Sequence, residues 1–253
     1  MNTRRNFLFK ILWAGAIFVW EFLRPTDARA QALRENTDNR SGLDFFPAEG
    51  NFVGKTRTGK HDKFYINYWK PMRRIQSSAW KLEISGLCEN SRTFTLDELK
   101  AFPAKTQRSR LKCVECWSAP AEWHGFHFSE LEKLVGPLPN ARGVVFYCGD
   151  TYVEHLSREV LNHPRALLAY NMDGGPLSDE HGFPLRVIVP FKYGYKNPKA
   201  ILKIEFVEET VYGTWSKIGP YSTDGTILPG WDHPLDQGKI KRRIAGGEIF
   251  DEL

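Results

Sequence analysis

The beginning of the chain combines two adjacent arginines, a short apolar segment and a small-residue motif. Arg4 and Arg5 precede the apolar residues 11–23, and Ala28-Arg29-Ala30 follows as an A-x-A cleavage site. This order is typical of a secretory signal, and the paired arginines make it a twin-arginine signal. Proteins exported by that route cross the membrane already folded. The rest of the chain is therefore expected to fold, and to take up any cofactor, before it leaves the cytoplasm.

The alternative is that the same segment remains as an N-terminal membrane anchor. The apolar run is short for a membrane span, however, and Glu21 interrupts it. Cleavage after Ala30 removes five basic and two acidic residues, so the formal net charge falls from +5 to +2. A protein so close to neutral gives no case for nucleic-acid binding. We therefore expect a periplasmic protein that binds no nucleic acid.

The residues after the signal are enough for one sizeable core. About 220 residues favour a single domain. Residues 31–63 are mostly polar and predict an extended arm, and the texture changes at Phe64, so we place the folded domain at residues 64–253. The chain has four cysteines. An oxidising compartment favours disulfides, but a protein that folds in the reducing cytoplasm is expected to use at least one cysteine in another role.

Apolar runs of strand length alternate irregularly with short helical signals. Strands are predicted at residues 80–84, 144–148, 166–170, 185–189 and 201–207. The segments 171–183 and 212–234 are rich in Gly, Pro, Asp and Ser and predict loops. No internal repeat, GxGxxG motif or phosphate loop is present in the sequence. The mixture favours an α+β fold over a regular βαβ series.

Two helices are predicted from capping signals. Thr95 and Glu98 form a capping box that opens a helix through Phe102. Ser129 and Glu132 repeat that signature, and the second helix is expected to stop at the Gly-Pro pair 136–137.

Cys113 lies in the most unusual cluster of the sequence. Arg108, Arg110 and Lys112 come within five residues of it, and nearby positive charge favours the thiolate form of a cysteine. A thiolate is a good ligand for a soft or high-valent metal. Cys116 follows three residues later.

Three interpretations of this cluster remain open from composition alone. The Cys113–Cys116 spacing fits a thioredoxin-like redox pair, although no βαβ pattern surrounds it. Cys113 and Cys116 could instead form a zinc site with His124 and His127, although the gap between the two pairs is short for such a site. In the third interpretation Cys113 alone binds a cofactor and Cys116 is a buried bystander.

A second cluster is basic. Arg186, Lys192, Lys196 and Lys199 lie close to glycine and proline turns, and such a group predicts a pocket for an anion, especially a phosphate. The alternative is a solvated basic loop beside a sheet. His155, His163 and His233 have no local partner in the sequence and are expected to be surface or core histidines.

Three motifs in this order resemble the sulfite oxidase superfamily and its oxidoreductase molybdopterin-binding domain. The resemblance covers residues 64–234, and it is strongest to the branch that reduces protein methionine sulfoxide in the periplasm. The motifs are Lys112-Cys113-Val114-Glu115-x-Trp117-Ser118, Trp123-x-Gly125-Phe126 and Gly182-x-Pro184-x-Arg186-x-Ile188-Val189-Pro190-x-Lys192-Tyr193-Gly194-x-Lys196.

The resemblance implies a molybdenum–molybdopterin cofactor with a defined set of contacts. Cys113 matches the family cysteine whose sulfur binds molybdenum, and Arg186 matches the arginine at the pterin phosphate. The segment Asn197-Pro198-Lys199 matches the part that closes over the same phosphate.

Four further contacts are implied less directly. Asn67 and Tyr68 lie near the family's N-terminal cofactor contact. Cys148 takes the place of a threonine that touches the pterin in the related reductases, and His181 takes the place of an asparagine that contacts the cofactor. Cys116 stands where those reductases have alanine. These departures alter the polar groups around the cofactor and leave the substrate open.

The resemblance implies an oxidoreductase, with a sulfoxide as the preferred substrate class. Oxidation of sulfite or another small oxyanion is the alternative on the same fold, and a zinc-binding or electron-relay module without catalysis is the alternative of another class. The chain leaves no room for the dimerisation domain or the fused haem domain of sulfite oxidases. We therefore expect a monomer that exchanges electrons with a separate membrane haem protein or soluble cytochrome, and that meets the twin-arginine translocase during export.

Overall fold

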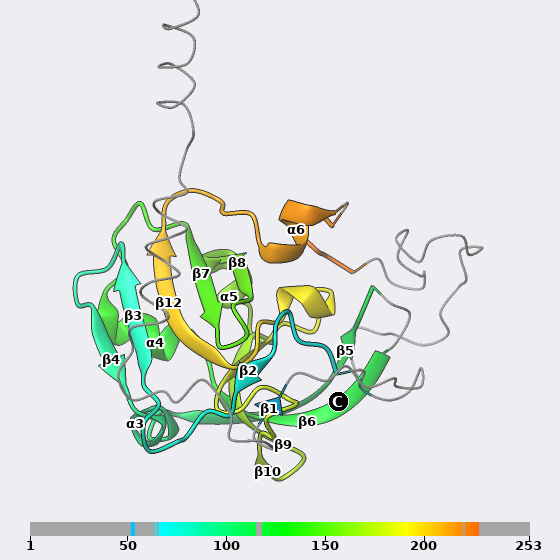
Figure 1. Ribbon diagram of the computed structural model, residues 1–253. Coiled ribbons are helices and arrows are strands. Elements are labelled where there is room, and N and C mark those ends of the chain that lie inside the picture. Colours follow the sequence, from blue (N-terminus) through cyan, green and yellow to red (C-terminus); the bar gives the residue numbers. More distant parts are fainter. Residues whose placement is uncertain (1–51, 54–63, 65, 115–117, 220, 228–253) are drawn as a thin grey trace, which may run out of the picture. The chain divides into compact units, whose positions relative to one another are not determined.

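The computed structural model describes residues 52–53, 64, 66–114, 118–219 and 221–227. The predicted signal, most of the predicted arm, Cys116 and His233 lie outside them. One five-stranded sheet has the spatial order β4 (Arg92–Phe94), β3 (Leu82–Gly86), β12 (Ile201–Val207), β7 (Gly143–Cys148) and β8 (Val153–Ser157). β3 and β12 are parallel, and the other pairs are antiparallel. Figure 1 shows β12 in yellow between β3 and β7.

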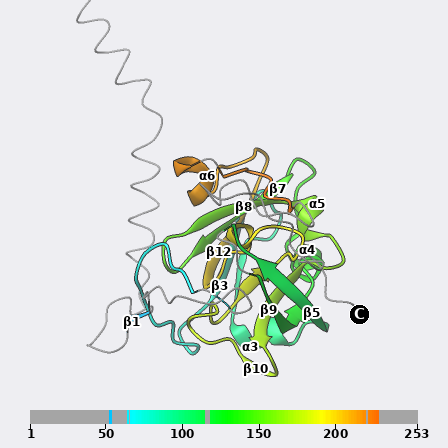
Figure 2. The ribbon, with the colours of Figure 1, turned by 90° about the vertical axis from the view of Figure 1, so that its right-hand side faces the viewer.

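The second five-stranded sheet is antiparallel. Four strands have the order β10 (Gly175–Pro176), β9 (Leu167–Met172), β6 (Ser118–Phe126) and β5 (Ala104–Lys112). β11 (Arg186–Ile188) also pairs with β9. Figure 2 views the fold from the side of β5. A further pair, β1 (Phe52–Val53) with β2 (Met72–Arg73), stands apart from both sheets. Mixed sheets of this kind confirm the predicted α+β class.

One main core is shared by the two sheets. It includes Ile84, Phe146 and Ile204 of the first sheet and Phe126 and Leu168 of the second. The strands of the first sheet alternate as half-buried strands should, with apolar side chains toward this core and charged ones outward.

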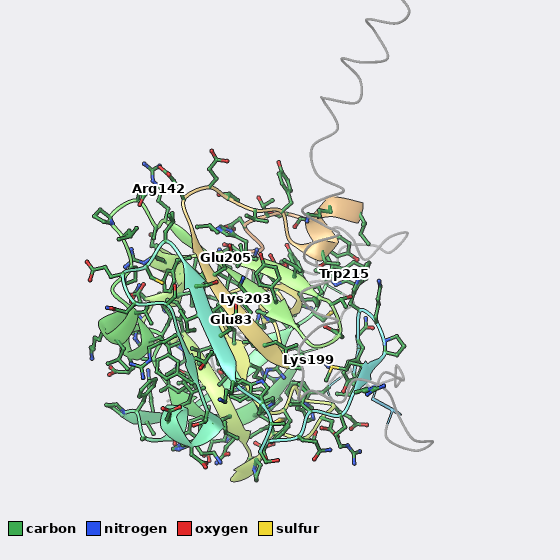
Figure 3. All side chains as sticks on the ribbon, turned by 60° about the vertical axis from the view of Figure 1, so that its left-hand side comes forward. Glu83, Arg142, Lys199, Lys203, Glu205 and Trp215 are labelled. Carbon is green, nitrogen blue, oxygen red and sulfur yellow. The ribbon has the colours of Figure 1, made fainter. Side chains whose placement is uncertain are left out.

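The outer face of the first sheet carries the charged residues. Lys203 Nζ lies 3.5 Å from Glu83 Oε1 and 3.7 Å from Glu205 Oε2. Figure 3 shows these three side chains together on β3 and β12. The alternation that predicted strands at 80–84 and 201–207 therefore has its physical cause in one buried and one solvated face.

The described helices are short, and α3 (Leu96–Lys100) begins as predicted. The Thr95 hydroxyl accepts a hydrogen bond from the Glu98 backbone N–H at 3.2 Å, and the Glu98 carboxylate accepts one from the Thr95 N–H at 2.7 Å. This reciprocal capping box confirms the sequence interpretation. The helix ends two residues before Phe102, with Ala101 as its C-cap.

The predicted cap of the second helix is wrong, although the helix exists. α4 (Ser129–Val135) has Phe128 at its N-cap, and Ser129 is already its first residue. The Ser129 hydroxyl bonds the His127 ring at 2.8 Å instead of capping the backbone. The C-terminus is as expected, because Gly136 takes the left-handed conformation at φ 59°, which glycine adopts without a Cβ clash.

The long hairpin of β5 and β6 was not predicted as strands. Its register runs from Ala104 opposite Phe126 to Lys112 opposite Ser118. The buried positions of β5 include Gln107 and Ser109 as well as Leu111, so polar residues stand where a sequence pattern looks for apolar ones. The alternation is therefore present in burial but hidden in composition.

Both predicted loops contain short elements. The segment 171–183 includes the end of β9 and all of β10, and the segment 212–234 includes α6 (Thr214–Ile218). The remaining elements are α5 (Arg158–Leu161) and the 3₁₀ turn η1 (Gly194–Lys196). Within the described residues, no helix is long and apolar enough to cross a membrane.

Candidate functional site

A cavity opens where loops from both sheets meet, and chain segments far apart in sequence line it. One wall comes from Phe64, Ile66, Asn67, Tyr68 and Trp69, and another from Leu111, Cys113 and Val114 around the end of β5. The remaining walls are formed by Asp150, Tyr152, Glu180, His181, Arg186, Gly194, Tyr195, Asn197, Pro198, Lys199, Trp215 and Tyr221. The cavity therefore collects most of the residues that the sequence singled out.

Cys113 follows directly after β5 and lines this cavity. The backbone of η1 lies close to it, since a Cβ built on Gly194 would stand 3.8 Å from the Cys113 Cα, at ordinary contact distance. Alternation along β5 points Arg108 and Arg110 away from the side of Leu111, which also lines the cavity. The positive charge of the cavity wall therefore comes from later parts of the chain rather than from these neighbours.

Arg186 supplies the first of these charges. It begins β11 and is 6% exposed. Its guanidinium donates through Nη1 to the His181 carbonyl at 2.8 Å and lies 4.9 Å from the centre of the Trp123 ring. The buried Nε has no hydrogen-bond partner among the described residues. Burial lowers the pKa of Arg186 to about 10, so the side chain still carries its charge at neutral pH.

Lys199 supplies the second charge, directly beside the first. A β-bridge pairs Arg186 with Lys199, which makes the two residues cross-strand neighbours. The Lys199 ammonium donates to the Glu180 carbonyl at 2.7 Å and lies 4.1 Å from the centre of the Tyr68 ring. Burial, and then repulsion from Arg186, lower its pKa to about 7. A buried cation with a partly buried one beside it is costly unless an anion joins them.

Asp150, one of the acidic residues of the cavity wall, is bound by backbone groups. Asp150 accepts hydrogen bonds from the backbone N–H groups of Trp69, at 2.8 Å, and Tyr152, at 3.1 Å. In the described part of the chain, neither Arg186 nor Lys199 forms a salt bridge with a carboxylate. The unpaired Nε of Arg186 and the adjacent ammonium thus form an anion site that the protein itself leaves open.

Hydrogen bonds fix the turn that carries the neighbouring predicted residues. The Asn197 side chain accepts from the Val189 N–H at 2.6 Å and donates to the Tyr193 carbonyl at 3.0 Å. The Pro198 carbonyl accepts from the Val187 N–H at 2.9 Å. Asn197 and Pro198 both line the cavity, and their polar groups in these bonds shape the loop itself.

The other predicted contacts divide between cavity and core. Asn67, Tyr68 and His181 line the cavity. The Tyr68 hydroxyl donates to the Asp179 carbonyl at 2.7 Å, and burial and the charge of Arg186 lower the pKa of His181 to about 4, so its ring is neutral. Cys148 is different. It ends β7 within the main core and is not itself one of the residues that line the cavity, and burial, followed by the charge of Asp150, raises the pKa of its thiol well above the usual value.

Two lysines of the predicted basic pocket lie outside it. Lys192 donates to Asp224 at 2.6 Å and to the Thr226 hydroxyl at 2.7 Å. Lys196 forms a buried ion pair with Glu154 at 2.6 Å. The sequence interpretation, which grouped four cations around one anion, is therefore wrong for Lys192 and Lys196. Their charges are balanced inside the protein, and they hold the loop rather than a ligand.

The buried pair continues into a network under the cavity floor. The Tyr152 hydroxyl donates to Glu154 Oε2 at 2.9 Å and lies 2.7 Å from the Tyr195 carbonyl, and Lys196 also donates to the His155 carbonyl at 2.7 Å. Because Tyr152 and Tyr195 line the cavity, this network fixes its floor. His155 was expected to be either a surface or a core histidine, and it is buried. Burial lowers its pKa to about 4.

The proposed zinc ligands do not converge. His124 pairs across the hairpin with Thr106, which is six residues from Lys112, or roughly 20 Å of extended strand from the Cys113 end. His124 bonds the Thr106 hydroxyl at 2.8 Å, and His127 bonds Ser129 and the His163 carbonyl. The described residues include no group of three or more His, Cys, Asp or Glu side chains placed to hold a metal. Cys116 lies outside them.

Sequence reasoning missed the aromatic side of the cavity. Trp69 and Trp215 meet edge to face with ring centres 5.4 Å apart, and Tyr221 lies 5.1 Å from Trp215. All three line the cavity. The available signal was the concentration of aromatic residues at 212, 215 and 221 within a segment otherwise rich in Gly, Ser and Asp.

Comparison with known protein families identifies the family to which the chain belongs. The profile of the oxidoreductase molybdopterin binding domain matches residues 69–215, more than half of the chain. The chain belongs to this family. The motif resemblance read from the sequence is thereby confirmed, and an oxidoreductase domain with a molybdopterin–molybdenum cofactor is established for the chain.

Two named relatives are similar to large parts of the chain. The chain is 35% identical over 203 residues to the protein-methionine-sulfoxide reductase catalytic subunit MsrP of Xanthomonas campestris pv. campestris, which covers 72% of this chain and 63% of the relative. It is 36% identical over 148 residues to a putative protein-methionine-sulfoxide reductase subunit YedZ1 of Azospira oryzae, covering 58% and 56%. The chain therefore spans just under two thirds of the length of the MsrP relative.

A solved structure supports the fold. The sulfane dehydrogenase SoxCD from Paracoccus pantotrophus matches with a TM-score of 0.52 and 20% identity, over 56% of this chain and 40% of that chain.

The cavity of this family member has the donors that molybdopterin needs. The pterin carries a phosphate, Arg186 presents a buried guanidinium whose Nε has no partner among the described residues, and Lys199 presents a partly buried ammonium beside it. Molybdenum takes thiolate ligands, and Cys113 presents a sulfur to the same cavity. The residues present therefore fit the cofactor.

Lys199 is expected to lower the free energy of unfolding of the cofactor-free protein at neutral pH. Its pKa falls from 10.5 to about 7 on folding, so between these values the unfolded chain binds a proton that the folded protein has lost. The free energy of unfolding therefore rises as pH increases from about 7 toward 10. The K199M variant removes this rise, which amounts to a few kcal/mol.

Urea unfolding of cofactor-free wild type and K199M at several pH values measures this effect. The wild type should gain stability relative to K199M as pH rises. A difference between the two proteins that stays constant from pH 7 to 10 would show that Lys199 keeps its ordinary titration.

Proposed function

We propose that this chain is a periplasmic molybdopterin-dependent reductase of sulfoxides, with methionine sulfoxide as its substrate class. The observation that carries the proposal is a single cavity that joins Cys113, the Arg186–Lys199 pair and an aromatic wall. Identity to MsrP at 35% supports the choice of substrate. The reaction consumes two electrons and two protons, breaks the sulfur–oxygen bond and releases the sulfide and water.

Different residues of the cavity would have different roles in binding the cofactor. Arg186 and Lys199 would hold the pterin phosphate through charge-assisted hydrogen bonds, and the segment Asn197-Pro198-Lys199, whose turn the Asn197 side chain fixes, would close over it. Cys113 would bind molybdenum through its sulfur. Asn67, Tyr68 and His181 would contact the cofactor from the cavity wall, and Cys148, which lies in the core, would take the place of the threonine that touches the pterin in the related reductases. When bound, the molybdenum group supplies two-electron oxygen-atom chemistry.

The aromatic wall suits the apolar end of the substrate. Sulfur and methyl groups make favourable contacts with aromatic rings, and Trp69, Trp215 and Tyr221 present three rings to the cavity. A small oxyanion such as sulfite has no group for these rings to contact. The wall is thus the feature that favours a sulfoxide over the alternative substrate.

Steady-state assays test the substrate class. The holoenzyme with reduced viologen as donor is expected to reduce N-acetylmethionine sulfoxide amide. The same preparation with ferricyanide as acceptor is expected to leave sulfite unoxidised. Oxidation of sulfite without reduction of any sulfoxide would overturn the proposed substrate and favour the oxyanion alternative.

We further propose that the signal occupies residues 1–30, the arm residues 31–63 and the oxidoreductase domain residues 64–253. The mature protein would act as a monomer and receive electrons from a membrane haem protein or a soluble cytochrome. The twin-arginine translocase would export it after cofactor insertion. The similarity of the chain to YedZ1, whose name describes it as a reductase subunit, supports a separate redox partner.

Replacement of both Arg4 and Arg5 by lysine tests the export route. The n-region keeps its charge, but the translocase reads the arginine pair as an address, so twin-arginine export should fail. The uncleaved protein should accumulate in the cytoplasm with molybdenum bound, as cell fractionation with a metal assay would measure. A normal periplasmic yield of the double variant would mean that the chain crosses unfolded.

A further inference from the structure

Residues 66–74, which we call the strap, connect the cavity to the main core. Residues 66–68 line the cavity and belong to no helix or strand of the described structure. The next residue, Trp69, donates its N–H to the buried Asp150 carboxylate at 2.8 Å, and Met72 in β2 packs in the main core. Figure 2 shows the strap as a cyan loop at the edge of the fold. The strap is therefore anchored from Trp69 onward, whereas the position of residues 66–68 depends on contacts made across the cavity.

The strap is joined to the turn 178–182 through Asp179. The Tyr68 hydroxyl donates to the Asp179 carbonyl at 2.7 Å, and Arg74 Nε lies 2.5 Å from Asp179 Oδ2. The side chains of Arg74 and Asp179 are 49% and 19% exposed. An ion pair this exposed changes an equilibrium constant by at most about fivefold. The strap and the turn are thus joined by contacts that can open without unfolding the domain.

The same turn holds both cations of the anion site. The Glu180 carbonyl accepts a hydrogen bond from Lys199 Nζ at 2.7 Å, and the His181 carbonyl accepts one from Arg186 Nη1 at 2.8 Å. Movement of the turn would therefore also move the hydrogen-bond acceptors of the two cations.

The strap covers the anion site from the other side. The centre of the Tyr68 ring lies 4.1 Å from Lys199 Nζ, so the ring shields one side of the ammonium. The two cations thus lie where the strap and the turn meet, and Asp179 joins these same two segments. A phosphate that reaches the cations comes to lie between segments that the Asp179 contacts hold together.

We propose that Asp179 and Arg74 form a clasp at the entrance of the cofactor cavity. The strap and the turn 178–182 part at this clasp to admit molybdopterin and close again over its phosphate. The inference rests on the cofactor of the proposed function and not on its substrate. Because the clasp is the same before and after loading, opening it changes the rates of cofactor entry and release by the same factor and leaves the affinity unchanged.

Two single variants and their combination test the clasp. For R74M and D179N we expect loading and release of the cofactor each to become up to about fivefold faster, and the double variant should match the single ones because all three lose the same ion pair. Release is followed by pterin fluorescence from the holoenzyme. Loading is followed after molybdenum cofactor, freed from denatured wild-type holoenzyme, is added to the cofactor-free full chain.

K133A is the matched control. It removes the Lys133–Glu130 ion pair on α4, whose side chains are 65% and 17% exposed, and should change neither rate. A residue that only positions the cofactor would act differently, because its loss would speed release, leave loading unchanged and weaken the affinity. That pattern in R74M and D179N, or wild-type rates in both, would overturn the clasp.

Hydrogen exchange of the cofactor-free proteins separates this inference from the proposed function. Residues 66–74 and 178–182 should exchange faster in R74M than in wild type or K133A, with the midpoint of thermal unfolding unchanged. If the wild type purifies without pterin, the proposed cofactor fails, and faster exchange in these two segments would still support a clasp at the entrance. Equal exchange in R74M and wild type would overturn it.

Discussion

Replacing Cys113 by serine is expected to abolish turnover while the domain remains folded. The side chain is only half-buried and stands at the end of β5, so loss of the sulfur should cost the fold little. A hydroxyl is a much poorer donor than thiolate to a soft or high-valent metal. Mutating a residue that only hydrogen-bonds to a metal ligand typically lowers metal affinity or activity by about 10–100-fold. Loss of the ligand itself should therefore lower the activity by at least about two orders of magnitude.

Three measurements on C113S check this result. Viologen-coupled activity should be lost, the electron paramagnetic resonance spectrum of molybdenum should change, and circular dichroism should remain that of the wild type. C88S is a suitable control, because the Cys88 sulfur lies 3.6 Å from the Ser91 hydroxyl, outside the cavity lining. C116A should also be tolerated. Wild-type activity with an unchanged spectrum in C113S would remove Cys113 from the metal site.

Removing Arg186 is expected to empty the cavity of cofactor more than it slows the molecules that remain loaded. A charge-assisted hydrogen bond contributes about 1.5–3 kcal/mol, which corresponds to roughly 10–100-fold in cofactor affinity. In R186A the Lys199 ammonium would face the phosphate alone. The molybdenum content at purification should therefore fall steeply, while kcat per molybdenum changes much less.

The control variants separate charge from packing. Arg186 also lies over the Trp123 ring, so R186A removes a packing contact, whereas R186K keeps a cation and should retain part of the metal. K203A removes a lysine from the outer face of the first sheet and should load normally. Thermal unfolding of the cofactor-free proteins records any loss of stability. Full molybdenum loading of R186A would assign the arginine another role.

The fold could be predicted where one chemical pattern dominated. The strand at 201–207 has the predicted bounds because Ile204 and Phe206 alternate with outward Lys203 and Glu205. The hairpin of β5 and β6 escaped prediction because buried Gln107 and Ser109 break the apolar pattern. Their environment comes from strands and loops distant in sequence, and no local pattern contains it.

The site could be predicted through its motif and less well through its charges. Arg186 and Lys199 were expected near each other, and the bridge between them is a consequence of the turn that separates β11 from β12. Lys192 and Lys196 lie outside the anion site because they pair with Asp224 and Glu154, which are 32 and 42 residues away in the chain. Ion pairs of that range, like the aromatic wall built from Trp69 and Trp215, appear only in three dimensions.

The central claim is that the cavity between Cys113 and the Arg186–Lys199 pair holds molybdopterin. The most direct measurement is the metal and pterin content of the wild-type protein, purified from cells that make the cofactor. We predict about one molybdenum and about one pterin phosphate per chain, without stoichiometric zinc. About one zinc ion per chain, with no pterin, would contradict the claim.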